Sequence, residues 1–195
     1  MAKAAVDFPR VEVTSRAEWR AWLQKNHTKS QSIWLVTFKK GDPRYLPNND
    51  VVEEALCFGW IDSLPRKLDA KRTMLMLAPR RSASAWSKLN KDRALRMIAA
   101  KKMTPAGLAK IKQAKVDGTW TKLDSVDALK VPADLVAAFR TFLGSAKNFA
   151  AFPPSARRGI LEWIVQAKRP ETRAKRIIET ARLAQVNQRA NQWRK

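Results

Sequence analysis

Apolar, β-branched stretches of strand length occur only before Arg80 in this sequence, and helical periodicity dominates the remainder. Residues 32–38 form such a stretch, bounded by polar residues and by the turn at 41–43, which is typical of a buried strand. Residues 60–64 and 73–77 are two further apolar segments, separated by a short polar stretch that fits a loop between antiparallel strands. The pattern predicts a small antiparallel sheet of about three strands.

Helix-start signals accompany the helical periodicity. Ser15 and Glu18 form a capping box ahead of an apolar face, and Asp50 and Glu53 repeat that arrangement. Ser84 is placed to cap a long helix that carries Lys and Arg on its outer side. Helices packed with a small sheet predict an α+β fold.

The C-terminal part of the sequence is helical throughout. Turn and small polar residues predict a linker near 123–130, and Pro132 and Pro170 each stand where a helix begins. We expect an α+β domain at 1–125, a helical unit at 126–187 and a polar tail at 188–195, the last of which should fray.

The formal net charge of +22 is extreme for 195 residues. The segment before Arg66 is nearly neutral, so the excess of Lys and Arg begins abruptly at that residue. A basic block of this kind predicts a face that attracts nucleic acid, anionic small molecules or acidic proteins. The alternative reading is that these cations only solvate the helices.

Several classes of protein are excluded by composition. Cys57 is the only cysteine and His27 the only histidine, so metal sites built from His and Cys are not expected, and no cofactor motif occurs. Cys57 lies on an apolar helix side, where a thiol stays protonated, so it does not form a catalytic dyad with His27. No stretch is apolar enough to span a membrane and no signal peptide begins the sequence, so we expect a cytoplasmic protein. No catalytic residues are assigned.

Arg80 and Arg81 are the strongest candidates for a ligand-binding site. They follow an expected strand and precede a helix N-terminus, where backbone N–H groups and the helix dipole favour anions. Ser84, Trp86, Ser87, Asn90, Trp60, Asp62 and Lys39 complete the candidate ligand-binding set. The alternative is a capped helix whose arginines pair with Asp62 or Asp69. Aromatic residues such as Trp34, Trp86 and Trp120 are either core residues or surfaces on which a base could stack.

Two strings carry a resemblance to a known family: ALCFGWID at 55–62 and PRRSASAWSKLN at 79–90. With them, the sequence resembles the bacteriocin-protection, YdeI/OmpD-associated family, and the resemblance extends over roughly residues 8–186. It implies a bacterial stress-response protein linked to tolerance of bacteriocins or antimicrobial peptides and to porin expression. It implies no molecular activity.

Three functions remain open at this stage. The first is a non-enzymatic stress-tolerance protein that binds an anionic ligand or an acidic partner through a basic cleft near Arg80. The second is a nucleic-acid-binding protein that uses its basic helices. The third is an enzyme with an unfamiliar site. Because many antimicrobial peptides are cationic, a protein of charge +22 would repel them, so direct capture of such peptides is not expected.

Overall fold

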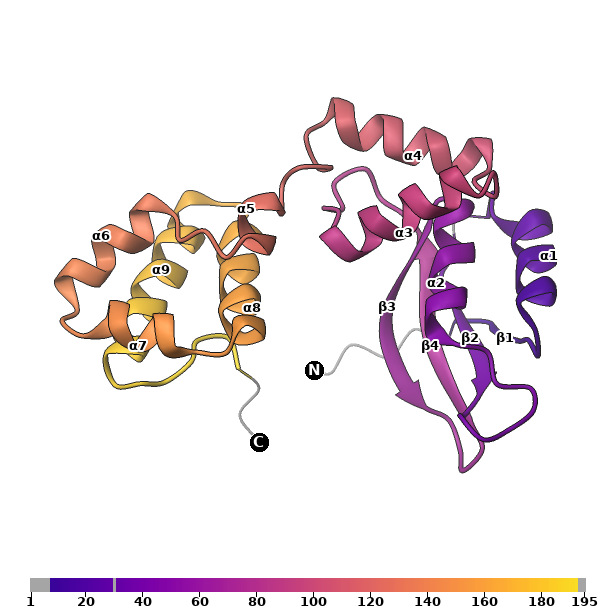
Figure 1. Cartoon of the computed structure of the whole chain (residues 1–195), viewed down its shortest axis with the longest axis horizontal. Helices are drawn as coiled ribbons and strands as arrows, with labels where there is room; N and C mark the ends of the chain where they lie inside the picture. Colours follow the sequence, from indigo (N-terminus) through magenta and orange to yellow (C-terminus); the bar gives the residue numbers. More distant parts are fainter. Residues whose placement is uncertain (1–7, 30, 193–195) are drawn as a thin grey trace. The chain divides into compact units, whose positions relative to one another are not determined.

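The computed structural model describes residues 8–29 and 31–192 (Figure 1). By its internal contacts the chain divides into two compact units, unit 1 up to Trp120 and unit 2 from Thr121 onward. The boundary expected from the sequence, after residue 125, falls within a short helix of unit 2, α5 (Asp124–Asp127).

Unit 1 combines one sheet with four helices among its described residues, and the expected α+β class is confirmed. Its elements in chain order are β1 (Arg10–Glu12), α1 (Arg16–Asn26), β2 (Ile33–Phe38), α2 (Asn48–Cys57), β3 (Trp60–Lys67), β4 (Arg72–Pro79), α3 (Lys88–Ala99) and α4 (Pro105–Val116).

The sheet has the strand order β1-β2-β4-β3. Pairing is antiparallel between β2 and β4 and between β4 and β3, as expected, but β1 adds a fourth strand that runs parallel to β2. The expectation of three antiparallel strands is therefore corrected to a four-stranded mixed sheet. Because β1 has only three residues, it shows no alternation of apolar and polar positions that would identify it in the sequence.

Helices α1 and α2 cover one face of the sheet. Trp19 of α1, Leu35 of β2 and Val51 of α2 are buried in one cluster. The indole Nε1 of Trp19 donates to the carbonyl of Val51 at 3.0 Å, so the largest apolar side chain of α1 also keeps its polar atom satisfied. Burial of each such side chain stabilises the fold by roughly 1.5–3 kcal/mol.

Asp50 and Glu53 do not cap α2, contrary to the capping box expected there. The helix begins at Asn48 with Pro47 at its N-cap, and both carboxylates bind arginines instead. Arg16 of α1 donates to Asp50 at 2.9 Å and to Glu53 at 3.2 Å. It also donates to the buried Glu54 at 2.7 Å. These ion pairs join α1 to α2 and neutralise the acidic residues of α2.

Helix α3 starts three residues later than expected. Ser87, not Ser84, is its N-cap, and its side chain accepts from the backbone N–H of Asn90. The backbone N–H of Ser84 instead donates to Arg81 O at 3.1 Å, which holds residues 81–84 in a turn. The segment from Arg80 to Ser87 is therefore a loop of unit 1 and not the first turn of α3.

Unit 2 is helical, as expected. Its elements after α5 are α6 (Ala133–Thr141), α7 (Ser145–Ala151), α8 (Pro154–Val165) and α9 (Pro170–Gln185). Helix α7 was missed because it is short and lies between turn residues. The expected linker at 123–130 is corrected, since Leu123 and Val126 are buried and α5 occupies this segment.

The polar tail is only partly described. Ala190 is buried, whereas Trp193 lies outside the described residues. None of the described helices is long and apolar enough to cross a membrane.

Candidate functional site

Arg80 follows β4 directly and is held in place by its backbone and by its side chain. Its N–H donates to Gly59 O at 2.9 Å, and its guanidinium carbon lies 3.8 Å from the centre of the Trp86 ring. Nη2 donates to Ala85 O at 2.6 Å and to Ser84 O at 3.3 Å. The side chain is 3% exposed, so a cation sits on the face of a buried indole.

Two of the three guanidinium nitrogens of Arg80, Nε and Nη1, are buried without a hydrogen-bond partner among the described residues. Burial lowers the pKa of Arg80 to about 10, and the nearby negative charge of Asp62 acts in the opposite direction. The group remains protonated at neutral pH. No ion pair to Asp62 is formed among residues 8–29 and 31–192, and Asp69 pairs with Arg72 at 2.8 Å. Arg80 therefore lacks both of the carboxylate partners considered for it.

A second segment, far along the chain, completes this region. After α4 ends, Gly118 adopts a φ of +74°, a backbone conformation that side chains disfavour, and it turns the chain back toward the loop after Arg80. Thr119 O then accepts from the N–H of Trp86 at 3.1 Å. The Trp86 and Trp120 rings lie 5.0 Å apart at an interplanar angle of 48°.

Two ammonium groups flank the half-buried Trp120. Lys91 of α3 and Lys115 of α4 place their Nζ atoms 5.8 Å and 5.6 Å from the centre of its ring. We use the name "Trp86 site" for the following set: Arg80, Arg81, Trp86, Thr119, Trp120, Lys91 and Lys115. The site presents cations around a pair of indoles, which suits an anionic group with or without an aromatic part.

The structure brings some of the candidate residues together. Arg81 is exposed next to Arg80, and its side chain has no hydrogen-bond or ion-pair partner in the described part of the chain. Ser84 contributes its carbonyl to Arg80, while Ser87 caps α3. The side-chain oxygen of Asn90 accepts from Arg93 at 3.0 Å, so Ser87 and Asn90 serve the start of the helix.

Other candidate residues lie elsewhere. Trp60 is in the core, 1% exposed, with its Nε1 bonded to His27 O at 2.9 Å. Lys39 lies at the opposite end of the sheet, where its Nζ donates to Asp69 O at 2.7 Å and to Ala70 O at 3.0 Å. Neither belongs to the Trp86 site.

Sequence reasoning left Thr119, Lys91 and Lys115 out of the candidate set and regarded Trp120 only as one of several aromatics. The signal that points to the segment is the string DGTW at 117–120, in which a glycine in a helix-ending position precedes a tryptophan. Contact with Trp86, however, depends on the packing of α4, which no local pattern encodes.

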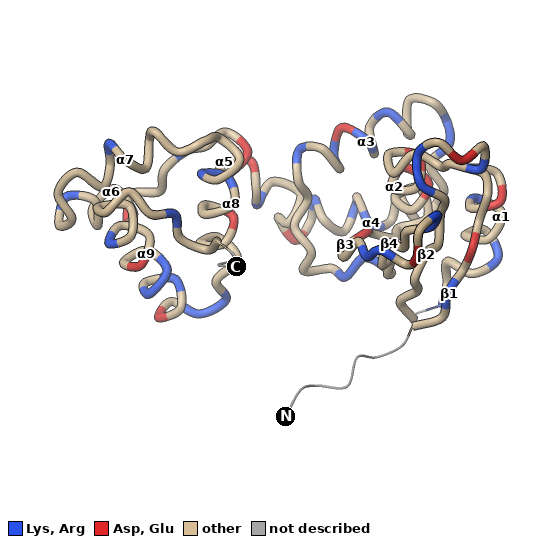
Figure 2. The backbone as a smooth tube through the Cα atoms, turned by 90° about the horizontal axis from the view of Figure 1, so that it is seen from below, with Lys and Arg blue, Asp and Glu red and all other residues tan. Residues whose placement is uncertain are grey.

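Lys and Arg are not confined to the Trp86 site. Figure 2 shows them along both units, including α3, α4 and α9. The acidic residues of α2, by contrast, form salt bridges with arginine: Asp50, Glu53 and Glu54. No group of three or more His, Cys, Asp or Glu side chains that could hold a metal ion is present in the described part of the chain.

Cys57 is buried, and that burial raises the pKa of its thiol to about 11. The imidazole of His27 contacts Leu23 O through Nδ1 at 3.0 Å. A protonated thiol is a poor nucleophile, so this pair offers no covalent chemistry at neutral pH.

Two family models match the chain. Residues 11–110 match the family described as "Domain of unknown function (DUF8412)", and residues 128–186 match the one described as "Bacteriocin-protection, YdeI or OmpD-Associated". No curated protein and no solved structure matches the chain. The second match confirms the expected family for unit 2, and the first covers more than half of the sequence. The chain therefore belongs to the DUF8412 family and carries a YdeI or OmpD-associated domain in its C-terminal helical unit.

Proposed function

We propose that this protein is a non-enzymatic stress-tolerance protein that binds an anionic group, on a small ligand or an acidic partner, at the Trp86 site. The observation that carries the proposal is that Arg80 is buried and still has two guanidinium nitrogens without partners. A role in bacteriocin protection is consistent with the family of unit 2.

Unpaired donors on a buried cation are costly, because each loses its hydrogen bonds to water and gains nothing in return. An oxyanion would satisfy such donors with charge-assisted hydrogen bonds, and the planar guanidinium favours carboxylate and phosphate. Nε and Nη1 are both below the surface, so an anion reaches them only if the loop at 81–85, which already binds Nη2 through Ser84 O and Ala85 O, or another covering segment moves aside. The exposed Arg81 lies in that loop and would meet the anion first.

The charge of the whole chain agrees with this assignment. A net charge of +22 raises the local concentration of anions and repels cationic peptides. Protection against cationic peptides by direct sequestration is therefore unfavourable, and protection through an anionic ligand or an acidic protein is favoured.

Calorimetric titration of the intact protein with pyrophosphate tests the proposal. Arg81→Glu should weaken binding at least about tenfold, because it replaces a charge-assisted contact by repulsion. Lys25→Glu makes the same change of charge at an exposed position of α1 and should have little effect. Equal losses in the two variants would mean that pyrophosphate responds only to net charge, which would contradict a site.

A second candidate function, nucleic-acid binding, is favoured by Trp120. A half-buried indole with an ammonium group 5.6 Å from its centre, that of Lys115, resembles the arrangement on which proteins stack a base of a single strand while contacting its phosphates. Trp120→Leu keeps an apolar contact with Trp86 but removes the stacking surface, and should weaken single-strand binding by about 1–3 kcal/mol.

Salt dependence separates the two candidates. Affinity for a labelled oligonucleotide should fall steeply with salt, by a slope of about −0.7 per phosphate contact on logarithmic axes. Affinity that does not change with salt would exclude nucleic acid as the partner.

A further inference from the structure

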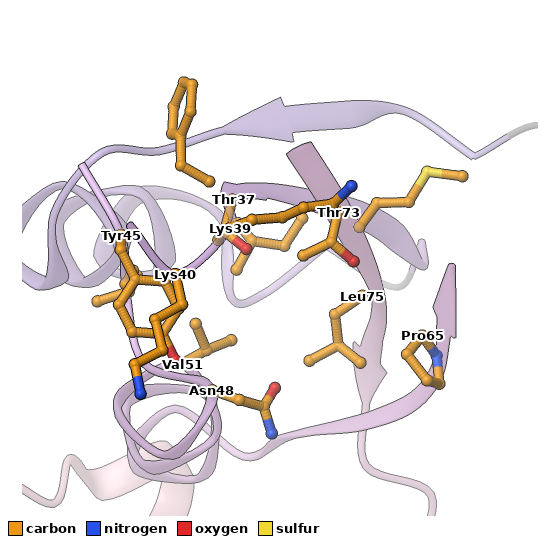
Figure 3. Close-up of a pocket in the computed structure, with 13 residues that line it drawn as sticks. Thr37, Lys39, Lys40, Tyr45, Asn48, Val51, Pro65, Thr73 and Leu75 are labelled. Atoms are coloured by element: carbon orange, nitrogen blue, oxygen red, sulfur yellow. The ribbon is translucent and has the colours of Figure 1, made fainter. Parts of the chain in front are cut away.

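A cavity of about 370 Å³ lies in unit 1, at the end of the sheet opposite to the Trp86 site. Figure 3 shows the residues that line it. Its lining residues come from β2, β3 and β4, from the loop after β2 and from the first turn of α2. This volume lies within the range of about 300–1,000 Å³ that is usual for small-molecule sites. Since a water molecule takes about 30 Å³, the cavity accommodates roughly a dozen non-hydrogen atoms.

The cavity exists because the strands extend past the N-terminus of α2. Thr37, Leu75 and Pro65 line it on the side of the sheet that α2 covers further along, but no helix covers them. Leu35 and Val51 close its inner end and are buried. The floor is therefore largely apolar and formed by the strands, with Pro65 following the irregularity of β3 after Asp62.

The loop after β2, residues 39–47, forms a fixed wall. Tyr45 pairs with Phe38 in a parallel β-bridge, and the Arg44 guanidinium lies 3.7 Å from the centre of the Phe38 ring. Asp42 accepts from the side chain of Arg44 at 2.9 Å. Lys39 ties the base of the loop to the β3–β4 turn through Asp69 O and Ala70 O. Fixed walls give a preformed site and lower the entropic cost of binding.

Asn48 supplies the polar end of the cavity. In the view of Figure 3 its amide lies between Val51 and Leu75. The side-chain amide of Asn48 forms no hydrogen bond with the described residues. The hydroxyl of Thr73, by contrast, already donates to Arg66 O at 2.9 Å. Asn48 is also the first residue of α2, whose N-cap, Pro47, has no capping side chain. The carbonyl of Pro47 accepts from the N–H groups of Asp50 and Val51 at 3.0 and 3.2 Å, so the donors left to a ligand are those of Asn48 and Asn49.

The charges around the cavity are positive. Lys39 and Lys40 line it, and neither forms a salt bridge with a carboxylate of residues 8–29 or 31–192. The carboxylates nearby are already engaged, Asp42 by Arg44, Asp50 by Arg16 and Asp69 by Arg72. Because the Lys39 ammonium is already held by Asp69 O and Ala70 O, an anionic head group at Asn48 meets the Lys40 cation, amide donors and the positive end of a helix.

From these observations we propose that the cavity binds a small organic carboxylate with an apolar body, its carboxylate at Asn48 and Lys40 and its body on Leu75 and Pro65. The ligand is either an aliphatic or an aryl acid, since both fit an apolar floor. The inference is independent of the Trp86 site.

Octanoate is the probe for the aliphatic acid and phenylpropionate for the aryl acid. Tyr45 is the only tyrosine of the chain and lines the cavity, so ring-labelled tyrosine gives a single reporter in the NMR spectrum of the intact protein. Both acids should shift its ring signals, and the one that binds more tightly identifies the class. Octanol, which has the apolar body without the charge, should bind more weakly than octanoate.

Variants then locate the site. Asn48→Trp places a large ring at an exposed position in the mouth of the cavity and should abolish binding without lowering the melting temperature. Lys40→Glu should weaken octanoate binding about threefold to fivefold, and Lys25→Glu should not. Equal affinities for octanoate and octanol, absence of a Tyr45 shift, or unchanged binding by Asn48→Trp would each overturn the proposal. Loss of octanoate binding in Arg81→Glu would place the ligand at the Trp86 site and overturn it as well.

Discussion

Gly107 of α4 packs directly on the backbone of Cys57, so that a Cβ atom at position 107 would lie 2.4 Å from the Cys57 carbonyl oxygen. The same atom would lie 2.8 Å from Leu56 O. Thr104, one turn earlier, donates its hydroxyl to Cys57 O at 2.6 Å. The start of α4 is thus fitted to the end of α2, and this contact positions α4 and, beyond it, Trp120.

Gly107→Ala should therefore destabilise unit 1. Overpacking against backbone costs about 1–3 kcal/mol, which exceeds the gain of up to about 1 kcal/mol that alanine brings inside a helix. The loss is measured as a lower midpoint in urea unfolding followed by circular dichroism.

Gly159 in α8 is the matched control, because nothing lies within 4 Å of a Cβ atom built there. Gly159→Ala should stabilise unit 2 by roughly 0.5–1 kcal/mol. An unchanged or higher midpoint for Gly107→Ala would contradict the close packing of α4 on α2.

Glu53 makes the stability of unit 1 fall as the pH becomes acidic. Burial alone would raise its pKa, but hydrogen bonds from Arg96 and Asn49 and the charge of Arg16 outweigh burial and hold the pKa below its ordinary value of 4.5. A carboxylate with a lowered folded-state pKa contributes stability that is present above its unfolded pKa and is lost as the pH falls through the folded pKa.

Urea unfolding between pH 7 and pH 3 measures this contribution. Glu53→Gln should cost about 1–3 kcal/mol at neutral pH and should flatten the loss of stability below about pH 4.5. Asp92→Asn, which removes an exposed carboxylate paired with Lys88, should change neither quantity appreciably. The same steep loss in wild type and Glu53→Gln would show that other carboxylates carry it.

Cys57 should be inert in the folded protein. Its thiol is 0% exposed, and burial raises its pKa to about 11, so almost no thiolate is present at pH 8. Iodoacetamide should label the protein only after denaturant is added, which mass spectrometry detects as a single adduct because the chain has one cysteine. Labelling of native protein within minutes would mean that the end of α2 opens readily.

The sequence predicted the elements that have strong local signals. Ser15 does cap α1, since it accepts from the N–H of Glu18, although the Glu18 carboxylate reaches back to Thr14 and not to Ser15. The apolar run of β2 is buried along its whole length. β1 was missed because three residues carry no period, and its strand conformation is fixed only by pairing with β2. Local patterns thus define long elements and leave short ones to tertiary contacts.

The candidate site was predicted less completely than the fold. The position of Arg80 after a strand was evident, but no local pattern indicated that its guanidinium would be buried on Trp86. That burial depends on Thr119 and Trp120, which are distant in sequence and are brought in by α4. The cavity near Asn48 was not predicted at all. It forms because the strands extend past the N-terminus of α2, and no local pattern encodes that difference. Only Lys39, among the candidate residues, lines it.

Arg80→Met separates a structural role of the guanidinium from a ligand-binding one. Methionine keeps an unbranched apolar side chain against the Trp86 ring and removes the two unpaired nitrogens, while it loses the hydrogen bonds of Nη2 to Ala85 O and Ser84 O. Because the relief of unpaired buried donors offsets those lost bonds, the free energy of unfolding should change by less than about 1.5 kcal/mol. Pyrophosphate binding, measured by calorimetry on the same preparation, should disappear.

Arg80→Ala, which leaves a void beneath Trp86, should be less stable by about 2–4 kcal/mol. If Arg80→Met folds normally and binds pyrophosphate as wild type does, Arg80 is a packing residue and the anion site must lie elsewhere.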